Sequence, residues 1–324
     1  MNELRRSYLS VNYSLRPAKQ VERRMLIDGF LLLSEIGFFI RDYNYMGMGS
    51  IHFVDFALFH KFLGIENMTS VEASHAIKKR VEFNAPYKAL IKVIAGYPIG
   101  NFIPELSQGA KHVLWLDYDN VLSREMLQDI SLATISLPAG SILLVTVDTE
   151  PPNNIGDREK DTPKNLRISQ QYFQEIAGDF LSPSLINEDF KYDLLPAINI
   201  KAIRTAIQVG KSGRTNEIFI PLFNFLYADG HRMLTLGGMI GTKKDQRKIA
   251  SSRFARMDYA RLTFEDEPYW IKVPVLTRKE HLYLESFMPC PDDWFPVDFE
   301  LAPEEVAQFR KIYRFFPCYA ELLL

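Results

Sequence analysis

The sequence predicts a doubly wound α/β fold, in which helices cover both faces of a largely parallel sheet. Five short, mainly apolar segments alternate with segments of helical periodicity between residues 42 and 147. Such strands are typical of parallel sheets buried on both faces, and the lengths between them suit helical crossovers. Two later apolar segments are joined by Asp229-Gly230, a dipeptide typical of hairpin turns. We therefore expect the sheet to end in an antiparallel hairpin.

The first predicted element is a helix over Ala18–Ile36. Its apolar residues recur at helical spacing and form one broad face. Lys19 and Arg23 fall off that face, and Glu22 is an exception to the pattern. Pro17 stands where proline favours the start of a helix.

Strands and helices alternate after this first helix. The predicted strands are Asp42–Met46, Asn67–Val71, Leu90–Ala95, His112–Leu116 and Ser141–Val147. The predicted helices between them are Ser50–Leu63, Ala76–Phe83, Phe102–Ser107 and Leu122–Ile135. In the first of these helices the candidate packing residues are Phe53, Phe56, Ala57, Phe59 and Phe62.

The second half of the chain begins with a polar loop, residues 151–164. Helices are predicted over Asn165–Phe180 and Leu195–Val209, and the hairpin strands over Glu217–Tyr227 and Arg232–Ile240. A basic connector, Gly241–Arg261, leads to a strand-like segment, Tyr269–Leu276, and to helices near Lys279–Phe287 and Pro303–Phe315. We divide the chain into an N-terminal helical cap (1–41), an α/β domain (42–262) and a C-terminal extension packed on it (263–324).

Composition and charge exclude several classes of protein. The chain has 324 residues, 47% hydrophobic and 24% charged, and a net charge of −2, which is typical of a globular protein without a general attraction for polyanions. The longest apolar run, Gly29–Ile40, contains Glu35 and is too short to span a bilayer. The first residues lack the apolar core of a signal peptide. We expect a soluble cytoplasmic protein with no membrane partner.

The two cysteines, Cys290 and Cys318, are far apart in the sequence and show no metal-binding spacing. We therefore expect reduced thiols and no metal site.

Glycine and acidic residues follow successive predicted strands. Gly47 and Gly49 follow the first strand, Glu72 the second, Gly96 the third and Asp117 the fourth. In open α/β sheets, ligands bind at the carboxyl ends of the strands. This coincidence predicts a ligand site at that edge of the sheet.

The spacing of these residues bears on which ligand is bound. A dinucleotide fingerprint needs a third glycine where this chain has His52, and no phosphate-binding GxxxxGK[ST] loop occurs. S-adenosylmethionine (SAM) fits better, because two glycines let the backbone approach its methionine part. Glu72, about 25 residues further on, is then placed to bind the ribose hydroxyls.

The segment Asp42–Val147 and the hairpin ending at Ile240 resemble the class I SAM-dependent methyltransferase fold, a Rossmann-like sheet closed by such a hairpin. The stretches VNYSLRPAKQVERRM, YMGMGSIHFVDFALFHKFLGIENMTSVEA, LWLDYDN and VPVLTRKEHLYLESFMP look like an uncharacterised prokaryotic family of putative O-methyltransferases. The resemblance implies SAM as cofactor and methyl transfer to oxygen or nitrogen. In the first motif of the fold, acid-x-G-x-G-x-G, Tyr45 takes the position of the acid and Ile51 that of the third glycine.

The candidate site residues follow from this comparison. The expected cofactor-binding residues are Gly47, Met48, Gly49, Ser50, Glu72, Ala73, Gly96, Tyr97, Asp117 and Tyr118. The candidates for catalytic acid–base work are Asp117, Asp119 and His52, and those for holding an anionic substrate group are Arg16, Lys19 and Arg23.

Each assignment has a structural alternative. The glycines also suit a tight turn, and His52 also suits a structural role. Asp119 or Asn120 also suits the cap of the helix that follows. The cations near Arg16 also suit a solvated start of a helix.

The stretch from Lys201 to Arg261 carries twelve lysines and arginines against four acids. We weigh contacts with nucleic acid through Lys243–Arg256 against a merely solvated charged face. Homo-oligomerisation is a further open prediction.

Two alternative functions stay open at the level of sequence. Tyr45 at the position of an acid motivates a catalytically degenerate methyltransferase fold that acts as a sensor or binds a partner. A Rossmann-like sheet also leaves an NAD-dependent enzyme open, which His52 at the position of the third glycine disfavours.

Overall fold

A computed structural model describes residues 16–152 and 160–317. One eight-stranded sheet runs through the molecule in the order β3-β2-β1-β4-β5-β7-β6-β8. Its strands are β1 (Asn44–Gly47), β2 (Asn67–Glu72), β3 (Ile91–Ala95), β4 (His112–Val121), β5 (Ile142–Asp148), β6 (Ile218–Ala228), β7 (Arg232–Gly241) and β8 (Tyr269–Ile271). The first five are parallel, and β7 is antiparallel to both β5 and β6. The predicted fold class and its closing hairpin are confirmed.

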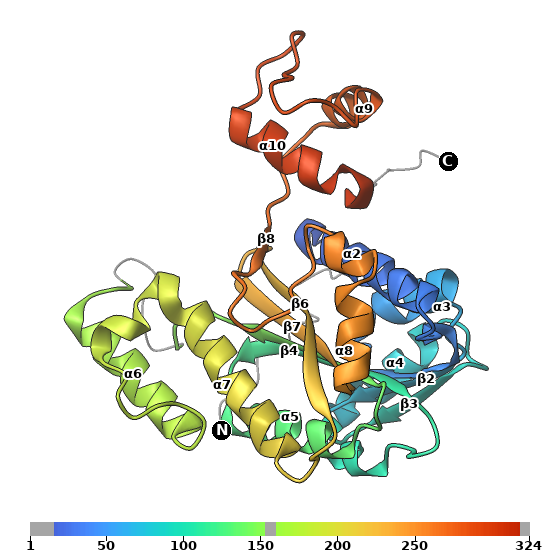
Figure 1. The fold of residues 1–324 in the computed structure, drawn as a ribbon, viewed down its shortest axis with the longest axis vertical. Coiled ribbons are helices and arrows are strands. Elements are labelled where there is room, and N and C mark those ends of the chain that lie inside the picture. The colour runs from blue at the N-terminus through green and yellow to red at the C-terminus, as the bar shows by residue number, and fades with distance from the viewer. Residues whose placement is uncertain (1–15, 153–159, 318–324) are drawn as a thin grey trace.

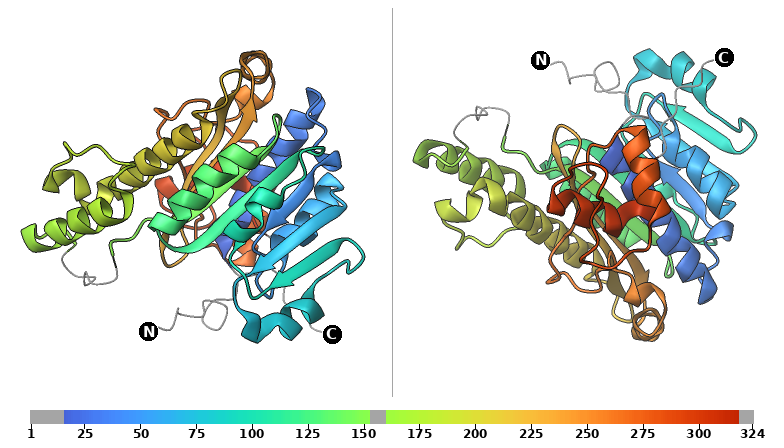
Figure 2. Two further views of the ribbon diagram at one scale, coloured as in Figure 1. Left: turned by 90° about the horizontal axis from the view of Figure 1, so that it is seen from below. Right: turned by 90° about the horizontal axis from the view of Figure 1, so that it is seen from above.

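Helices cover both faces of this sheet (Figures 1 and 2). One face packs against α2 (Pro17–Glu35), α3 (Val54–Leu63), α4 (Lys78–Asn84) and α8 (Lys243–Ala250). The other packs against α5 (Arg124–Ser136), α6 (Pro163–Ala177) and α7 (Leu195–Lys211). Two apolar clusters, one on each face, therefore form the core.

Short 3-10 turns join several of these elements. They span Ile40–Asp42, His75–Ile77, Ile99–Asn101, Ile103–Glu105, Asn187–Phe190, Tyr192–Leu194, Phe254–Arg256 and Tyr313–Phe315. The helix expected over Phe102–Ser107 is replaced by one of them, Ile103–Glu105.

The C-terminal helices α9 (Arg278–Ser286) and α10 (Pro303–Ile312) stand apart from the sheet, beyond the extended chain that follows β8 (Figure 1). β8 itself pairs with β6 in the main sheet. It ends at Ile271 and is therefore shorter than the predicted strand Tyr269–Leu276, whose Pro274 also has no backbone N–H to donate to a ladder. The proposed domain boundaries stay a prediction.

The helix after the first strand begins later than predicted. α3 starts at Val54 rather than Ser50, because Ser50 (φ 51°) and Phe53 (φ 49°) lie in the left-handed region, which a right-handed helix excludes. Four of the five expected packing residues are buried or half-buried, but Phe62 is 59% exposed.

β4 runs past its predicted end at Leu116 and continues through Asp117 to Val121, with a shift of register against β5. The expectation that Asp119 or Asn120 caps the next helix is therefore wrong. Ser123 caps α5, and its hydroxyl accepts a hydrogen bond of 3.3 Å from the amide of Met126.

The basic connector Gly241–Arg261 contains a helix that we did not predict, α8. A capping box starts it: the Thr242 hydroxyl accepts from the Asp245 amide, and the Asp245 carboxylate accepts from the Thr242 amide. Ile249 anchors the helix in the core.

The described residues contain neither a membrane-spanning helix nor a metal-binding cluster. No helix within them combines the length and apolar character needed to cross a bilayer. They also contain no group of three or more histidine, cysteine, aspartate or glutamate side chains arranged to hold a metal ion. Cys290 is a free thiol, and Cys318 lies outside the described residues.

Candidate functional site

The turn between β1 and α3 requires glycine because other atoms approach it closely. A Cβ atom on Gly47 would lie 2.4 Å from the Tyr45 hydroxyl, and one on Gly49 would lie 2.5 Å from the Ser70 hydroxyl. The Gly49 amide also donates to Ser70 on β2, at 3.2 Å. The two glycines therefore hold the turn tightly against β1 and β2.

This same turn contains strained backbone. Ser50 and Phe53 adopt left-handed φ values although neither is glycine, and each such residue costs on the order of 1 kcal/mol. Met48 and Ser50 are half-buried. Backbone strain of this kind is concentrated at ligand sites more than elsewhere.

The ends of β2 and β3 are joined at Glu72. Its backbone carbonyl accepts a 2.8 Å hydrogen bond from the Gly96 amide, and its side chain accepts one of 3.0 Å from the Ser74 amide. Gly96 has a left-handed φ of 96°, which glycine adopts without strain. Burial raises the pKa of Glu72. Ala73 and Tyr97, beside these strand ends, are exposed.

A buried ion-pair cluster lies at the end of β4. The ammonium nitrogen of Lys19 is 2.7 Å from Oδ1 of Asp117 and 2.9 Å from Oε2 of Glu22. It also lies 4.5 Å from the centroid of the Trp115 ring. Burial alone would raise the pKa of Asp117, but the charge and hydrogen bond of Lys19, together with the charges of Arg23 and Arg16, outweigh it and hold that pKa below its usual value. Asp117 is therefore a carboxylate at neutral pH.

The β6–β7 hairpin positions the helix that carries Lys19. The carboxylate of Asp229, in the hairpin turn, accepts hydrogen bonds from the amides of Ala18 (3.0 Å) and Lys19 (2.9 Å) at the start of α2. Arg16 lies beside it, with Nε 3.9 Å from Asp229 Oδ2. The Asp-Gly turn thus caps a helix some 210 residues earlier in the chain.

Several of the predicted site residues interact electrostatically. Arg16 interacts electrostatically with both Asp117 and Asp119, and Glu72 interacts with Asp119. The structure therefore brings the ends of β2 and β4 and the start of α2 to one edge of the sheet. Tyr118 points elsewhere, since its hydroxyl donates to Asp129 on α5 at 2.8 Å.

His52, in the β1–α3 turn, and Arg23, on α2, interact electrostatically. Burial, and then the charges of Arg80 and Arg23, lower the pKa of His52, so that its imidazole is neutral at neutral pH. Arg23 is only 3% exposed. Its charge also acts on Asp55 and Asp117.

Sequence reasoning missed two parts of this edge. The buried hydroxyl of Tyr45 donates to Asp55 on α3, so a carboxylate stands directly behind the residue at the acid position of the motif. At the end of β5, Asp148 is 3.1 Å from Nδ1 of His231, and Glu150 is 2.7 Å from Lys160. Acids that follow a fifth strand were the available signal.

The comparisons with known proteins begin with solved structures. Fibrillarin, a pre-rRNA processing protein of Methanococcus jannaschii, is 10% identical, over 63% of this chain and 68% of its own, with a TM-score of 0.36. TomG of Streptomyces achromogenes, an O-methyltransferase of tomaymycin synthesis solved with SAM, is 12% identical, over 72% and 94%, with a TM-score of 0.36.

Human N-acetylserotonin methyltransferase, solved with SAM, is 12% identical over 68% of this chain, at a TM-score of 0.35. The chain spans about half the length of that enzyme, 52%. No curated protein matches the sequence.

A family model supports the resemblance directly. The model described as "Putative O-methyltransferase" matches residues 11–324. The match extends from the segment before α2 through the C-terminal helices, and so covers nearly the whole chain. The protein therefore belongs to this family of putative O-methyltransferases.

Proposed function

We propose that the protein transfers a methyl group from SAM to an oxygen of an acceptor molecule. One observation carries the proposal: the glycine turn at the end of β1, Glu72 at the end of β2, Gly96 after β3 and Asp117 in β4 meet at the carboxyl edge of the parallel strands. That edge is where such sheets bind nucleoside ligands. Membership of the O-methyltransferase family agrees with it.

The residues of this edge fit the parts of SAM. Gly47 and Gly49 hold the turn tightly against β1 and β2, at the strand ends where such sheets bind ligands. Glu72 offers a carboxylate to the ribose hydroxyls. Gly96 and the exposed ring of Tyr97 lie where the adenine would be flanked. SAM, when bound, supplies an activated methyl group. The protein's contribution is to position it against the acceptor and to exclude competing water.

An acceptor hydroxyl must lose its proton during transfer. His52 is the best base of the three candidates, because its lowered pKa keeps the imidazole neutral and able to accept a proton. Asp117, held ionised by Lys19, is a weak base, and we assign it to orienting the acceptor hydroxyl. Asp119 is exposed at the outer end of β4. Arg16 is placed to attract an acidic group on the acceptor.

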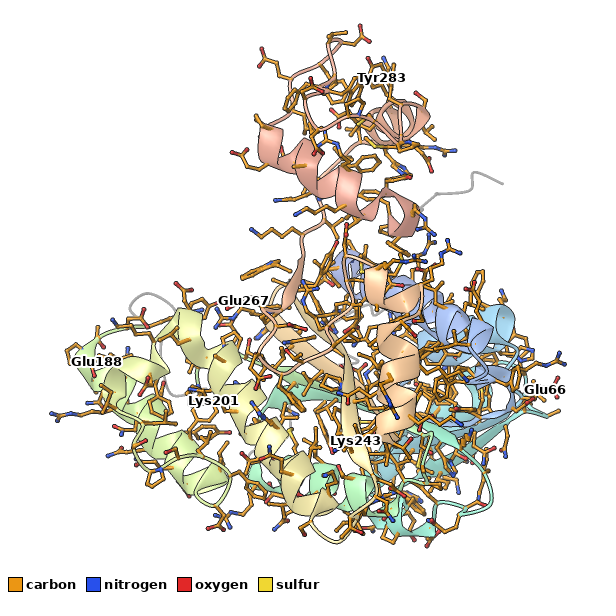
Figure 3. All side chains as sticks on the ribbon, viewed as in Figure 1. Glu66, Glu188, Lys201, Lys243, Glu267 and Tyr283 are labelled. Atoms are coloured by element: carbon orange, nitrogen blue, oxygen red, sulfur yellow. The ribbon has the colours of Figure 1, made fainter. Side chains whose placement is uncertain are left out.

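Calorimetric titration with S-adenosylhomocysteine tests the proposal without knowledge of the acceptor. Glu72→Ala should weaken binding by about tenfold or more, since a hydrogen bond to a charged group contributes about 1.5–3 kcal/mol. Glu66→Ala is the matched control. Glu66 is an exposed acid that directly precedes β2, at the opposite end of that strand from Glu72 (Figure 3). Absence of binding by the unmodified protein at millimolar ligand would overturn the proposal.

The other partners stay predictions. Six exposed cations lie on or after α8: Lys243, Lys244, Arg247, Lys248, Arg253 and Arg256. Figure 3 shows Lys201 on α7 and Lys243 at the start of α8, so the basic stretch is divided between the two faces of the sheet. A nucleic-acid contact through α8 would weaken steeply with salt. No observation favours the degenerate alternative, and none bears on oligomerisation.

A further inference from the structure

Arg23 is a buried cation whose hydrogen bonds are incomplete. It lies one turn after Lys19 on α2 and is only 3% exposed. Its Nε and Nη1 atoms are buried, and no atom of the described residues accepts a hydrogen bond from either. A buried charge without a direct partner is costly. An arginine kept in this position is therefore a candidate for binding an anion.

The nearest acids are already engaged with other groups. The carboxylate of Asp55 accepts a hydrogen bond from Tyr45, and that of Asp117 accepts one from Lys19. Lys19 thus has two carboxylate partners, Asp117 and Glu22, whereas Arg23 forms no ion pair within the described part of the chain. Burial further raises the pKa values of Asp55 and Glu22, which reduces the negative charge around the guanidinium.

The position of Arg23 indicates which part of a ligand it meets. Its charge acts on His52 in the β1–α3 turn, on Asp55 in the first turn of α3 and on Asp117 in β4. α2 packs beside α3 (Figure 1), and the ten-residue α3 directs its positive N-terminal end toward this turn. The guanidinium therefore lies close to the glycine turn, among His52, Asp55 and Asp117.

We propose that Arg23 binds the α-carboxylate at the amino-acid end of SAM. The inference rests on the proposed function, in which Glu72 holds the ribose at the other end of the same ligand. A guanidinium matches a carboxylate through two parallel N–H···O bonds. This contact completes the hydrogen bonds of Arg23 and fixes the sulfonium between Glu72 and Asp117. An acidic acceptor is the other source of a carboxylate, and it approaches from Arg16.

Two ligands that differ in one group test the proposal. SAM and decarboxylated SAM differ only in the α-carboxylate, and both are titrated calorimetrically into the full chain. We expect the unmodified protein to prefer SAM by about 10- to 100-fold, as a charged hydrogen-bonded pair implies. In Arg23→Gln this preference should fall to about twofold or less, with the affinity for decarboxylated SAM nearly unchanged. Arg23→Lys keeps the positive charge but loses the paired N–H donors of the guanidinium, so its preference for SAM should be intermediate.

Arg24→Gln is the matched control. Arg24 is the next residue on the same helix, and its Nη1 donates to the carbonyl of Phe316, at 3.1 Å. This variant loses the same charge and should keep the full preference for SAM. Circular dichroism establishes that each variant is folded.

The outcomes separate the two proposals. If Arg23→Gln lowers the affinity for both ligands by the same factor, or leaves both affinities unchanged, Arg23 is structural and the inference is wrong. Equal binding of both ligands by the unmodified protein also contradicts it and leaves an acidic acceptor as the source of the anion. Failure of the unmodified protein to bind SAM at all would instead overturn the proposed function.

Discussion

At the scale of single residues, α2 carries two cations that are almost completely buried. Lys19 and Arg23 fall off the apolar face, which is typical of solvated side chains, yet both are at least 97% buried, with exposures of 1% and 3%. Their surroundings come from residues distant in sequence: Asp117 is 98 positions from Lys19. Helical periodicity detects faces of a helix and carries no information on such long-range pairs. The acid and glycine positions at strand ends, in contrast, were predictable from local pattern.

The pair of Lys19 and Asp117 gives a prediction for stability. Lys19→Met leaves Asp117 and Glu22 without their buried counter-ion and should lower the free energy of unfolding by about 3 kcal/mol at pH 7. Chemical denaturation measures this loss. Lys201→Met, at an exposed position of α7, should change stability by less than about 0.5 kcal/mol.

The same variant should show a characteristic pH dependence. Lys19 lowers the folded-state pKa of Asp117, so their pairing contributes stability above the unfolded-state pKa of aspartate, and that contribution is lost as the pH falls through the lowered value. The deficit of Lys19→Met should therefore shrink as the pH falls below about 4, the unfolded-state pKa of aspartate. A deficit that grows on acidification would contradict the assignment.

At the scale of elements, several strands and the hairpin were predicted correctly from local sequence, whereas one helix and the length of one strand were not. Strand positions followed from apolar runs, and the hairpin followed from Asp229-Gly230. α8 was missed although Thr242 and Asp245 form a recognisable capping box. The length of β4 beyond Asp117 depends on pairing with β5, which its own sequence does not encode.

The cap of α2 gives a prediction at this scale. Asp229→Ala removes the carboxylate that binds the amides of Ala18 and Lys19 and should cost about 1–2 kcal/mol of stability. Hydrogen exchange of these two amides should accelerate, and affinity for S-adenosylhomocysteine should fall, because α2 carries Lys19 and Arg23 to the site.

Thr242→Ala is the control for this experiment, since it removes the cap of α8 instead. It should cost a similar amount of stability without affecting ligand affinity. Equal loss of affinity in both variants would show that α2 has no particular role in the site.

At the scale of the whole molecule, one sheet brings residues between Arg16 and Asp229 to a single edge. The Rossmann-like sheet and its closing hairpin were implied by the resemblance to methyltransferases and were confirmed. The placement of α9 and α10 was not predictable in detail, because it depends on pairs of residues distant in sequence, such as Arg314, just after α10, with Asp28 on α2 at 3.6 Å.

A crystal structure of the protein with S-adenosylhomocysteine tests the central claim most directly. The account predicts the nucleoside at the ends of β1 and β2, with the ribose hydroxyls hydrogen-bonded to Glu72 and the α-carboxylate at Arg23. A ligand bound elsewhere, or bound at this edge without contact to Glu72, would contradict it.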